Sequence, residues 1–69
     1  MEMKPVESSN IAEIGYDSAA KALRIKFKNG GTHEYADVPA DAHKALMDAE
    51  SVGSHFHRNI RGAYLSHKV

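Results

Sequence analysis

The chain has 69 residues, with nine acidic and nine basic side chains and a formal net charge of zero at pH 7. This length suits one domain, and the balanced charge excludes a bulk electrostatic attraction to nucleic acid or membrane. Cysteine is absent, which excludes disulfides and thiolate metal sites. The sequence shows no signal-peptide pattern and no long apolar run, so a cytoplasmic protein is expected.

The N-terminal part of the chain predicts a flexible arm followed by a strand. Residues 1–7 are expected to form the arm, because chain ends fray unless another element holds them. In residues 11–16 the apolar side chains Ala12, Ile14 and Tyr16 alternate with other residues and share one face. This segment is therefore expected to be the first strand of a sheet.

A β-hairpin is predicted from residue 22 to residue 36. Its first half alternates Leu23, Ile25 and Phe27 with charged or small residues, as in a strand that is buried on one side. Asn29-Gly30-Gly31 follows, and these residue types accept the positive φ angles of tight turns. Thr32 then begins the return strand.

The length of the hairpin loop decides which side chains face the core. A two-residue loop would bury the Glu34 carboxylate among apolar side chains, which is energetically costly. A three-residue loop over residues 29–31, with a glycine bulge, instead pairs Phe27 with His33 and Ile25 with Tyr35 and leaves Glu34 outside. The longer loop is therefore expected.

The first strand agrees with this choice of faces. If Tyr16 pairs with Leu23, then Glu13 pairs with Lys26, and the outer face carries the row Glu13–Lys26–Glu34. Opposite charges on neighbouring strands are mildly favourable. Two independent turns thus predict one apolar and one charged face for a three-stranded antiparallel β-meander.

Two short helices are predicted after this sheet. Pro39 suits the first turn of one helix, which Gly53 is expected to end, and Ser54 is expected to cap a second helix that runs to about Arg61. The predicted fold class is α+β: a three-stranded antiparallel meander followed by two short helices packed on one face, in a single domain over residues 1–69 with a flexible tail at 66–69. The helical side chains expected in the core are Ala42, Ala45, Leu46, Ala49, Phe56 and Ile60.

The C-terminal part of the chain carries the strongest functional signal. All nine acids lie at or before Glu50, whereas three Arg or Lys residues and three histidines follow it. Such asymmetry indicates an anionic partner, with a solvated basic face as the alternative. Two of the arginines are three residues apart, and arginine forks bind phosphate well. The candidate nucleic-acid-binding residues are Arg58, Arg61, Tyr64, Lys68 and His57.

Other chemistries receive less support from the sequence. His55 and His57 are two apart, so on a helix their imidazoles point in different directions, and no metal site and no cofactor are expected. Histidine, arginine and tyrosine also serve metal-free ribonucleases, but no nucleophile–base pair can be read from the spacing, so no catalytic residue is assigned. Tyr16, Tyr35 and Phe27 could form an exposed base-stacking platform, but their apolar neighbours favour the core.

The pattern of turns and core positions resembles the KTSC domain, a family named after the C-terminus of some lysyl-tRNA synthetases that also occurs as small stand-alone bacterial proteins. The resemblance covers residues 6–65. Family members carry Tyr-x-Tyr where this chain has His33-Glu34-Tyr35, and often asparagine at the position of His57. The matching residues are Ser8-Ser9-Asn10-Ile11, Ile14-Gly15-Tyr16-Asp17, Leu23-x-Ile25-x-Phe27, Asn29-Gly30-Gly31, Tyr35, Val38-Pro39, Ala49-Glu50-Ser51-x-Gly53, Phe56, Ile60-Arg61 and Tyr64.

The resemblance implies a role in RNA binding, with RNA or tRNA as the partner, and supplies no catalytic residue. The leading hypothesis is therefore a small non-enzymatic binding module that contacts RNA through the basic C-terminal patch. The alternative is a protein–protein interaction module or a homodimer, because a small core with an unpaired sheet edge favours association. A metal-free ribonuclease is a third and less favoured hypothesis.

Overall fold

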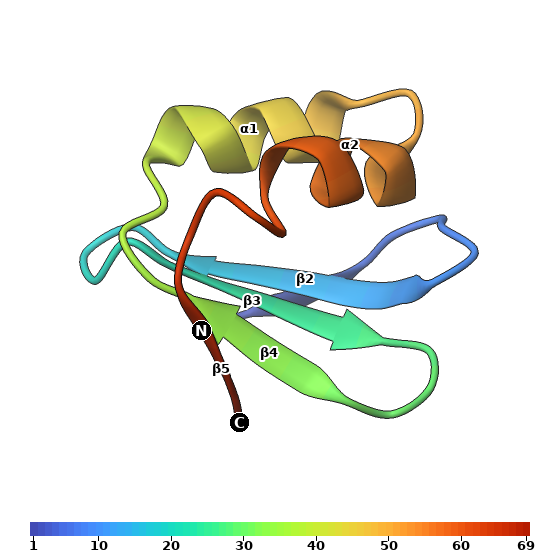
Figure 1. The fold of residues 1–69 in the computed structure, drawn as a ribbon, viewed down its shortest axis with the longest axis horizontal. Helices are drawn as coiled ribbons and strands as arrows, with labels where there is room; N and C mark the ends of the chain where they lie inside the picture. The colour runs from blue at the N-terminus through green and yellow to red at the C-terminus, as the bar shows by residue number, and fades with distance from the viewer.

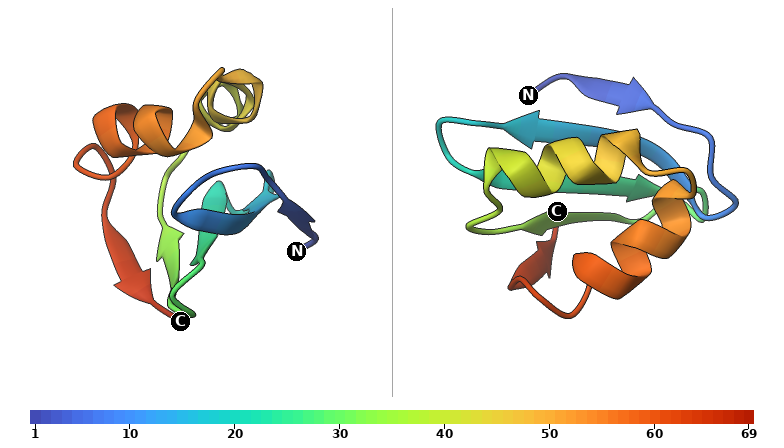
Figure 2. Two further views of the ribbon diagram at one scale, coloured as in Figure 1. Left: turned by 90° about the vertical axis from the view of Figure 1, so that its right-hand side faces the viewer. Right: turned by 90° about the horizontal axis from the view of Figure 1, so that it is seen from above.

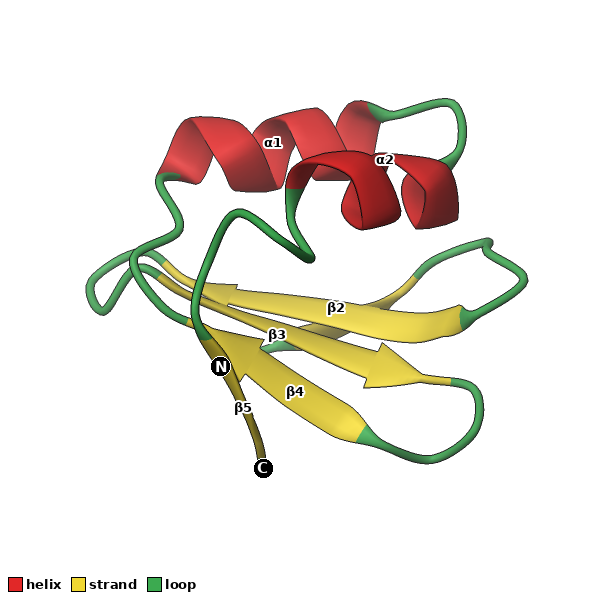
Figure 3. Ribbon diagram, in the orientation of Figure 1, coloured by secondary structure: helices red, strands yellow, loops and turns green.

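The computed structural model describes all 69 residues and shows two helices on one face of a five-stranded antiparallel sheet (Figure 1). The other face of the sheet carries no helix (Figure 2), and short loops join the strands at both ends of the sheet (Figure 3). Neither helix is long and apolar enough to cross a membrane. The elements are β1 (Met3–Pro5), β2 (Ile11–Asp17), β3 (Ala22–Phe27), β4 (Thr32–Tyr35), α1 (Ala40–Asp48), α2 (Val52–Asn59) and β5 (Ser66–Lys68).

The α+β class is confirmed, but the sheet has five strands in the order β1-β2-β3-β4-β5, and the prediction of three was wrong. Residues 1–7 and 66–69, both expected to be flexible, each contribute a three-residue edge strand. The Val6 amide donates to the Ala12 carbonyl at 3.2 Å, and the Val69 amide to the Thr32 carbonyl at 3.0 Å. Backbone hydrogen bonds hold both edges, so their side chains need not follow an apolar pattern.

The β3–β4 hairpin has the expected sidedness but a different register. Its three-residue loop starts at Lys28, one residue earlier than expected, and is closed by a 2.8 Å bond from the Phe27 amide to the Gly31 carbonyl. The pairing therefore shifts by two residues, and an even shift leaves every side chain on its face. Tyr35 is 4% exposed and pairs with Leu23, while Glu34 lies on the outer face.

The loop starts early because the Asn29 side chain forms a local turn. Its Oδ1 accepts a hydrogen bond from the Gly31 amide at 3.0 Å, so Gly31 lies opposite Phe27 and β4 begins at the next residue, Thr32. Gly30 takes the positive φ of 99° that closes a loop of this kind.

The β2–β3 pairing is as predicted over most of its length. Tyr16 pairs with Leu23 and Ile14 with Ile25, but a bulge at Ala12 changes the start of the strand. Because of the bulge, Ile11 is fully buried and Ala12 is only half-buried. Ala12 was expected on the apolar face with Ile14, but Ile11 takes that place in the core.

On the outer face, Arg24 rather than Lys26 is the partner of Glu34. The Arg24 Nη2 and Nε atoms both donate to Glu34 Oε1, at 2.6 and 3.2 Å. His67 Nε2 of β5 lies 4.0 Å from the other carboxylate oxygen. The two-residue shift of register brings Arg24 to the position that Lys26 was expected to fill.

The helices begin and end differently from the prediction. α1 ends at Asp48, and α2 begins at Val52 with Ser51 as its cap, whose Oγ accepts from the Ser54 amide at 3.4 Å. Gly53 therefore lies inside the first turn of α2. A Cβ there would be 2.9 Å from Ser8 Oγ, so glycine lets α2 pack on the loop before β2.

The core lies between the helices and the inner face of the sheet. On α1 only Leu46 is fully buried, and Ala45, which was expected to face the core, is exposed. Val38, which precedes α1, and Val52, the first residue of α2, are buried as well. The buried apolar side chains are Ile11, Ile14, Leu23, Ile25, Tyr35, Val38, Leu46, Val52, Phe56 and Ile60.

The contact between β1 and Gly15 can be tested by substitution. A Cβ at Gly15 would collide with the Met3 side chain and lie 3.1 Å from the Glu2 carbonyl oxygen. We expect Gly15→Val to displace β1 and to lower the free energy of unfolding by about 1–3 kcal/mol. Urea unfolding measures the loss, and hydrogen exchange at the Val6 amide reports on β1 itself.

Gly62→Ala is the matched control for this substitution. A Cβ at Gly62 would meet no atom within 4 Å, so its free energy of unfolding should stay within about 0.5 kcal/mol of the parent. Unchanged protection of Val6 in the Gly15 variant would show that β1 does not depend on this contact.

The burial of His43 is expected to make the stability of the fold depend on pH. Its ring stacks on Tyr16 at 4.5 Å, and burial, with a further contribution from the Lys4 charge, lowers the pKa of His43 below 6.5. The unfolded chain then binds this proton more readily than the folded one. The contribution to stability is complete above pH 6.5 and decreases as the pH falls from there through the lower folded pKa.

We expect His43→Phe, which keeps the ring stack but cannot titrate, to lose less stability on acidification. The free energy of unfolding in urea at about pH 7.5 and about pH 5 measures this difference. A variant that loses as much stability as the parent between these two pH values would contradict the assignment.

Candidate nucleic-acid interface

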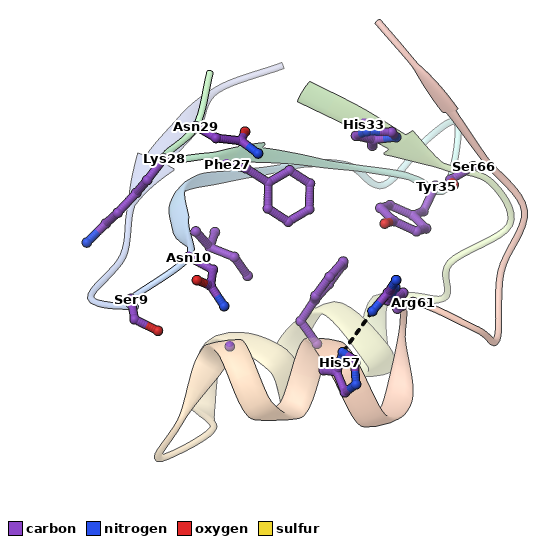
Figure 4. A pocket seen from close by; sticks show the side chains of 13 residues that line it. Ser9, Asn10, Phe27, Lys28, Asn29, His33, Tyr35, His57, Arg61 and Ser66 are labelled. Atoms are coloured by element: carbon purple, nitrogen blue, oxygen red, sulfur yellow. Dashed lines mark hydrogen bonds between the residues drawn. The ribbon is translucent and has the colours of Figure 1, made fainter. Parts of the chain in front are cut away.

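An open hollow lies between α2 and the adjoining part of the sheet, and we call it the α2 groove (Figure 4). Its volume is about 850 Å³, within the range of roughly 300–1,000 Å³ that is typical of ligand sites. The residues that line it are Ser9, Asn10, Ile11, Phe27, Lys28, Asn29, His33, Tyr35, Gly53, Phe56, His57, Arg61 and Ser66.

The floor of the α2 groove is aromatic. Phe56 of α2 meets Phe27 of β3 and Tyr35 of β4 in edge-to-face contacts, each with ring centroids 5.6 Å apart. Phe27 also contacts the His33 ring at 5.8 Å, although His33 pairs with Ile25 and not, as predicted, with Phe27. Phe56 and Tyr35 are buried, whereas Phe27 keeps part of its ring accessible. The core prediction for Tyr35 is therefore confirmed, and Phe27 serves both the core and the groove.

Two basic side chains meet where α2 ends. Arg61 Nη1 lies 3.2 Å from His57 Nδ1. Arginine can only donate, so His57 Nδ1 is the acceptor, and the neutral ring carries its proton on Nε2. The backbone places these two side chains together. The Ile60 and Arg61 amides both donate to the Phe56 carbonyl, and the chain leaves the helix at this point. The Arg61 side chain therefore lines the groove.

The electrostatics of the α2 groove favour an anion. No acidic residue lines it, whereas Lys28 and Arg61 carry fixed positive charges and His33 and His57 add imidazole groups. Glu34, the acid of β4, lies on the opposite face of the sheet, paired with Arg24. A chain of zero net charge thus presents one locally positive hollow.

Tyr35 contributes a neutral hydroxyl group to this hollow. Burial raises the pKa of Tyr35 above 10.0, and a hydrogen bond with Ser66 and the charge of Arg61 act in the opposite direction. At neutral pH the phenol therefore keeps its proton. It offers a donor and an acceptor next to Arg61 without adding negative charge.

The structure brings two of the five predicted site residues into the groove. His57 and Arg61 line it, whereas Arg58, Tyr64 and Lys68 do not. Arg58 is exposed on α2, and Tyr64 packs partly against the core. Lys68 pairs with His33 across β4 and β5, which places it on the same face of the sheet as the groove.

The remaining polar residues of the groove were missed because they come from distant parts of the chain. Asn10 precedes β2, Lys28 and Asn29 form the hairpin loop, and Ser66 starts β5. One signal of the groove was available in the sequence: His33 is a polar residue at a core-facing position of a predicted strand. A polar side chain among apolar neighbours often marks the wall of a site.

A smaller hollow of about 460 Å³ lies on the other side of the molecule, between β1 and α1. Its lining includes Glu2 as well as Lys4 and Lys44, so its charge is mixed. No three His, Asp or Glu side chains are grouped so that they could hold a metal ion. The α2 groove is therefore the stronger candidate site.

The fold and the groove define a small α+β domain in which two helices cover one face of an antiparallel sheet. A family model described as the KTSC domain matches residues 7–64, and the chain belongs to this family. The crystal structure of a KTSC domain protein from Yersinia pestis superimposes with a TM-score of 0.96 and 41% identity, over 99% of this chain and 96% of that one.

Two sequence relatives place the family in two settings. A protein from Tsukamurella paurometabola is 45% identical over 51 residues, which are 74% of this chain and 76% of the relative. A lysine–tRNA ligase from Trichormus variabilis is 37% identical over 62 residues, which are 90% of this chain and 11% of the ligase. The family thus includes small proteins and one segment of a much longer enzyme.

Proposed function

We propose that this domain is a non-enzymatic module that binds single-stranded RNA in the α2 groove. The observation that carries the proposal is an acid-free hollow whose lining combines Lys28, Arg61 and two histidines with the partly accessible ring of Phe27. Single-stranded nucleic acids are bound by this combination, because cations hold the phosphates and aromatic rings stack on the bases.

The size of the charged region limits the strength of binding. Two fixed cations, Lys28 and Arg61, line the groove, so about two phosphates are neutralised. The logarithm of the affinity should then fall with the logarithm of the salt concentration with a slope of about −1.4. Dissociation constants of about 10⁻⁴–10⁻⁶ M are expected for such a site.

RNA is the nucleic acid that the relatives support. The similar lysine–tRNA ligase has tRNA in its name, and its matching segment covers 90% of this chain. Unpaired loops and ends of RNA present splayed bases that a groove of this size accepts. We therefore propose single-stranded RNA, including the unpaired parts of tRNA, as the ligand class.

The sheet edges give less support to the alternative of a protein-interaction module or homodimer. Both edge strands have three residues, and β1 contains Pro5, which has no amide proton to donate. Lys4 and Lys68 add charge to these edges. Short, charged and proline-containing edges are common ways in which proteins prevent strand pairing with a second chain.

The arginine pair offers a matched test of the binding site. Both residues carry the same charge near the end of α2, but only Arg61 lines the groove. We expect Arg61→Ala to weaken binding of fluorescein-labelled single-stranded RNA about tenfold, and Arg58→Ala by less than about twofold. Fluorescence anisotropy at two salt concentrations measures both, with a tRNA as second ligand.

Three results would contradict the proposal. Absence of binding by the parent protein at low salt would remove RNA as the ligand. Equal losses in the two arginine variants would assign binding to a diffuse basic face. Cleavage of the RNA on a gel, abolished by His57→Gln, would make the domain a ribonuclease and exclude a purely binding role.

A further inference from the structure

We infer that the α2 groove, if it binds RNA as proposed above, reads one unstacked base through the lactam group that uracil and guanine share, a carbonyl next to a ring N–H. Two carboxamides at one end of the groove, those of Asn10 and Asn29, would make this selection. The inference therefore deepens the proposed function and rests on it.

The carboxamide of Asn29 has a defined orientation. Its Oδ1 is held by the Gly31 amide at 3.0 Å, and this bond assigns which end of the group is oxygen. The Nδ2 group makes no hydrogen bond within the protein, and Figure 4 shows it on the side of Phe27. Asn29 therefore presents its Nδ2 donor on the side of Phe27.

Asn10 is held beside Asn29 by backbone hydrogen bonds. The Lys28 amide donates to the Asn10 carbonyl at 2.8 Å, which joins the loop before β2 to the hairpin loop. Ser8 Oγ accepts from the Asn10 amide at 3.3 Å and fixes the loop from the other side. The Asn10 carboxamide itself is unengaged within the protein, so it can supply an acceptor.

This amide end is rigidly connected to the rest of the groove. Gly53 in the first turn of α2 lies so close to the Ser8 loop that a Cβ would come within 2.9 Å of Ser8 Oγ. The same helix carries His57 one turn further on, next to Arg61. The amide end and the cationic end are therefore fixed relative to each other by α2.

The groove thus has an amide end and an end formed by His57 and Arg61, with an aromatic ring between them. Lys28 lies beside the amides, and its side chain points away from the ring (Figure 4). Figure 4 shows Asn10 and Asn29 toward one side, His57 and Arg61 toward the other, and the ring of Phe27 in the middle. A nucleotide has the same division. Its base can stack on Phe27 with its edge toward the amides, while its phosphate meets the cations.

The donor and acceptor pattern then selects the base. Asn29 donates to a ring carbonyl and Asn10 accepts from the adjacent ring N–H, a pair that uracil and guanine present on their Watson–Crick edges. Cytosine and adenine present an amino group next to a bare ring nitrogen. Their amino group would face the donor of Asn29, and both groups would be left unpaired in the groove.

Two matched pairs of RNA octamers test this inference. Uridine has a carbonyl next to a ring N–H, where cytidine has an amino group next to a bare ring nitrogen. Inosine and adenosine differ in the same way on a purine ring. We expect the uridine octamer to bind about tenfold more tightly than the cytidine octamer, and inosine to exceed adenosine similarly. Fluorescence anisotropy at low salt measures all four affinities.

Asn29→Asp separates recognition from folding. Its carboxylate can still accept from the Gly31 amide, so the turn is kept, but the donor is lost. The added charge weakens all four octamers alike, whereas the ratio of uridine to cytidine should fall to about one. Asn59→Asp is the control, since Asn59 is exposed outside the groove and its variant should keep the preference.

The outcomes distinguish the two levels of the proposal. Equal affinity for all four octamers, with binding still dependent on Arg61, would overturn base reading and leave RNA binding in place. Binding of none of the octamers would overturn both. A preference that persists in Asn29→Asp would also overturn the role of Asn29, provided that amide exchange shows the hairpin loop to be intact.

Discussion

The contact of Phe56 with Phe27 and Tyr35 is the interaction on which the rest of the structure depends. Both ring pairs are edge-to-face at 5.6 Å, and they join α2 to the middle strands of the sheet. Such a pair contributes about 0.5–1.5 kcal/mol beyond its buried area, which is large for a domain of this size. The same rings close the core and form the floor of the groove. Fold and candidate site are therefore built from one set of side chains, and α2 cannot move without opening both.

The sidedness of the sheet was predictable from one physical constraint, the cost of burying the Glu34 carboxylate. The structure keeps Glu34 on the outer face and Tyr35 in the core, although the loop begins one residue earlier than expected. This constraint excludes a shift of the register by one residue, because that shift would bury Glu34. It does not distinguish between registers that differ by two residues, which leave every side chain on the same face. The turn formed by the Asn29 side chain decides between those, and its effect depends on a single local hydrogen bond. β1 and β5 were missed because these short edges are held largely by backbone hydrogen bonds and carry no alternating apolar pattern.

The candidate site was predictable only where it lies on one continuous element. His57 and Arg61 follow each other along the end of α2, and the absence of acids after Glu50 marked this region. Arg58 was included because the helix was expected to run on to Arg61, whereas α2 ends at Asn59. The other half of the groove is assembled from two loops and the start of β5, which are distant in sequence, so no spacing rule applies. The pairing of β2 with β3 brings Asn10 to the hairpin loop, and the pairing of β4 with β5, a strand that was not predicted, brings in Ser66.

The separation of charge explains how a neutral chain can have a positive site. On the sheet, the face away from the helices holds the ion pair of Arg24 and Glu34, with His67 close to the same carboxylate. The face toward the helices carries His33 and Tyr35 on the same strand. Because strand side chains alternate, β4 places its acid on one face and its groove residues on the other. Glu34 is paired with Arg24 on the outer face, so it does not neutralise Lys28 of the hairpin loop or Arg61, which follows α2. A positive groove therefore does not need a net positive charge on the chain, since alternation within a single four-residue strand keeps the carboxylate off the face that carries the groove.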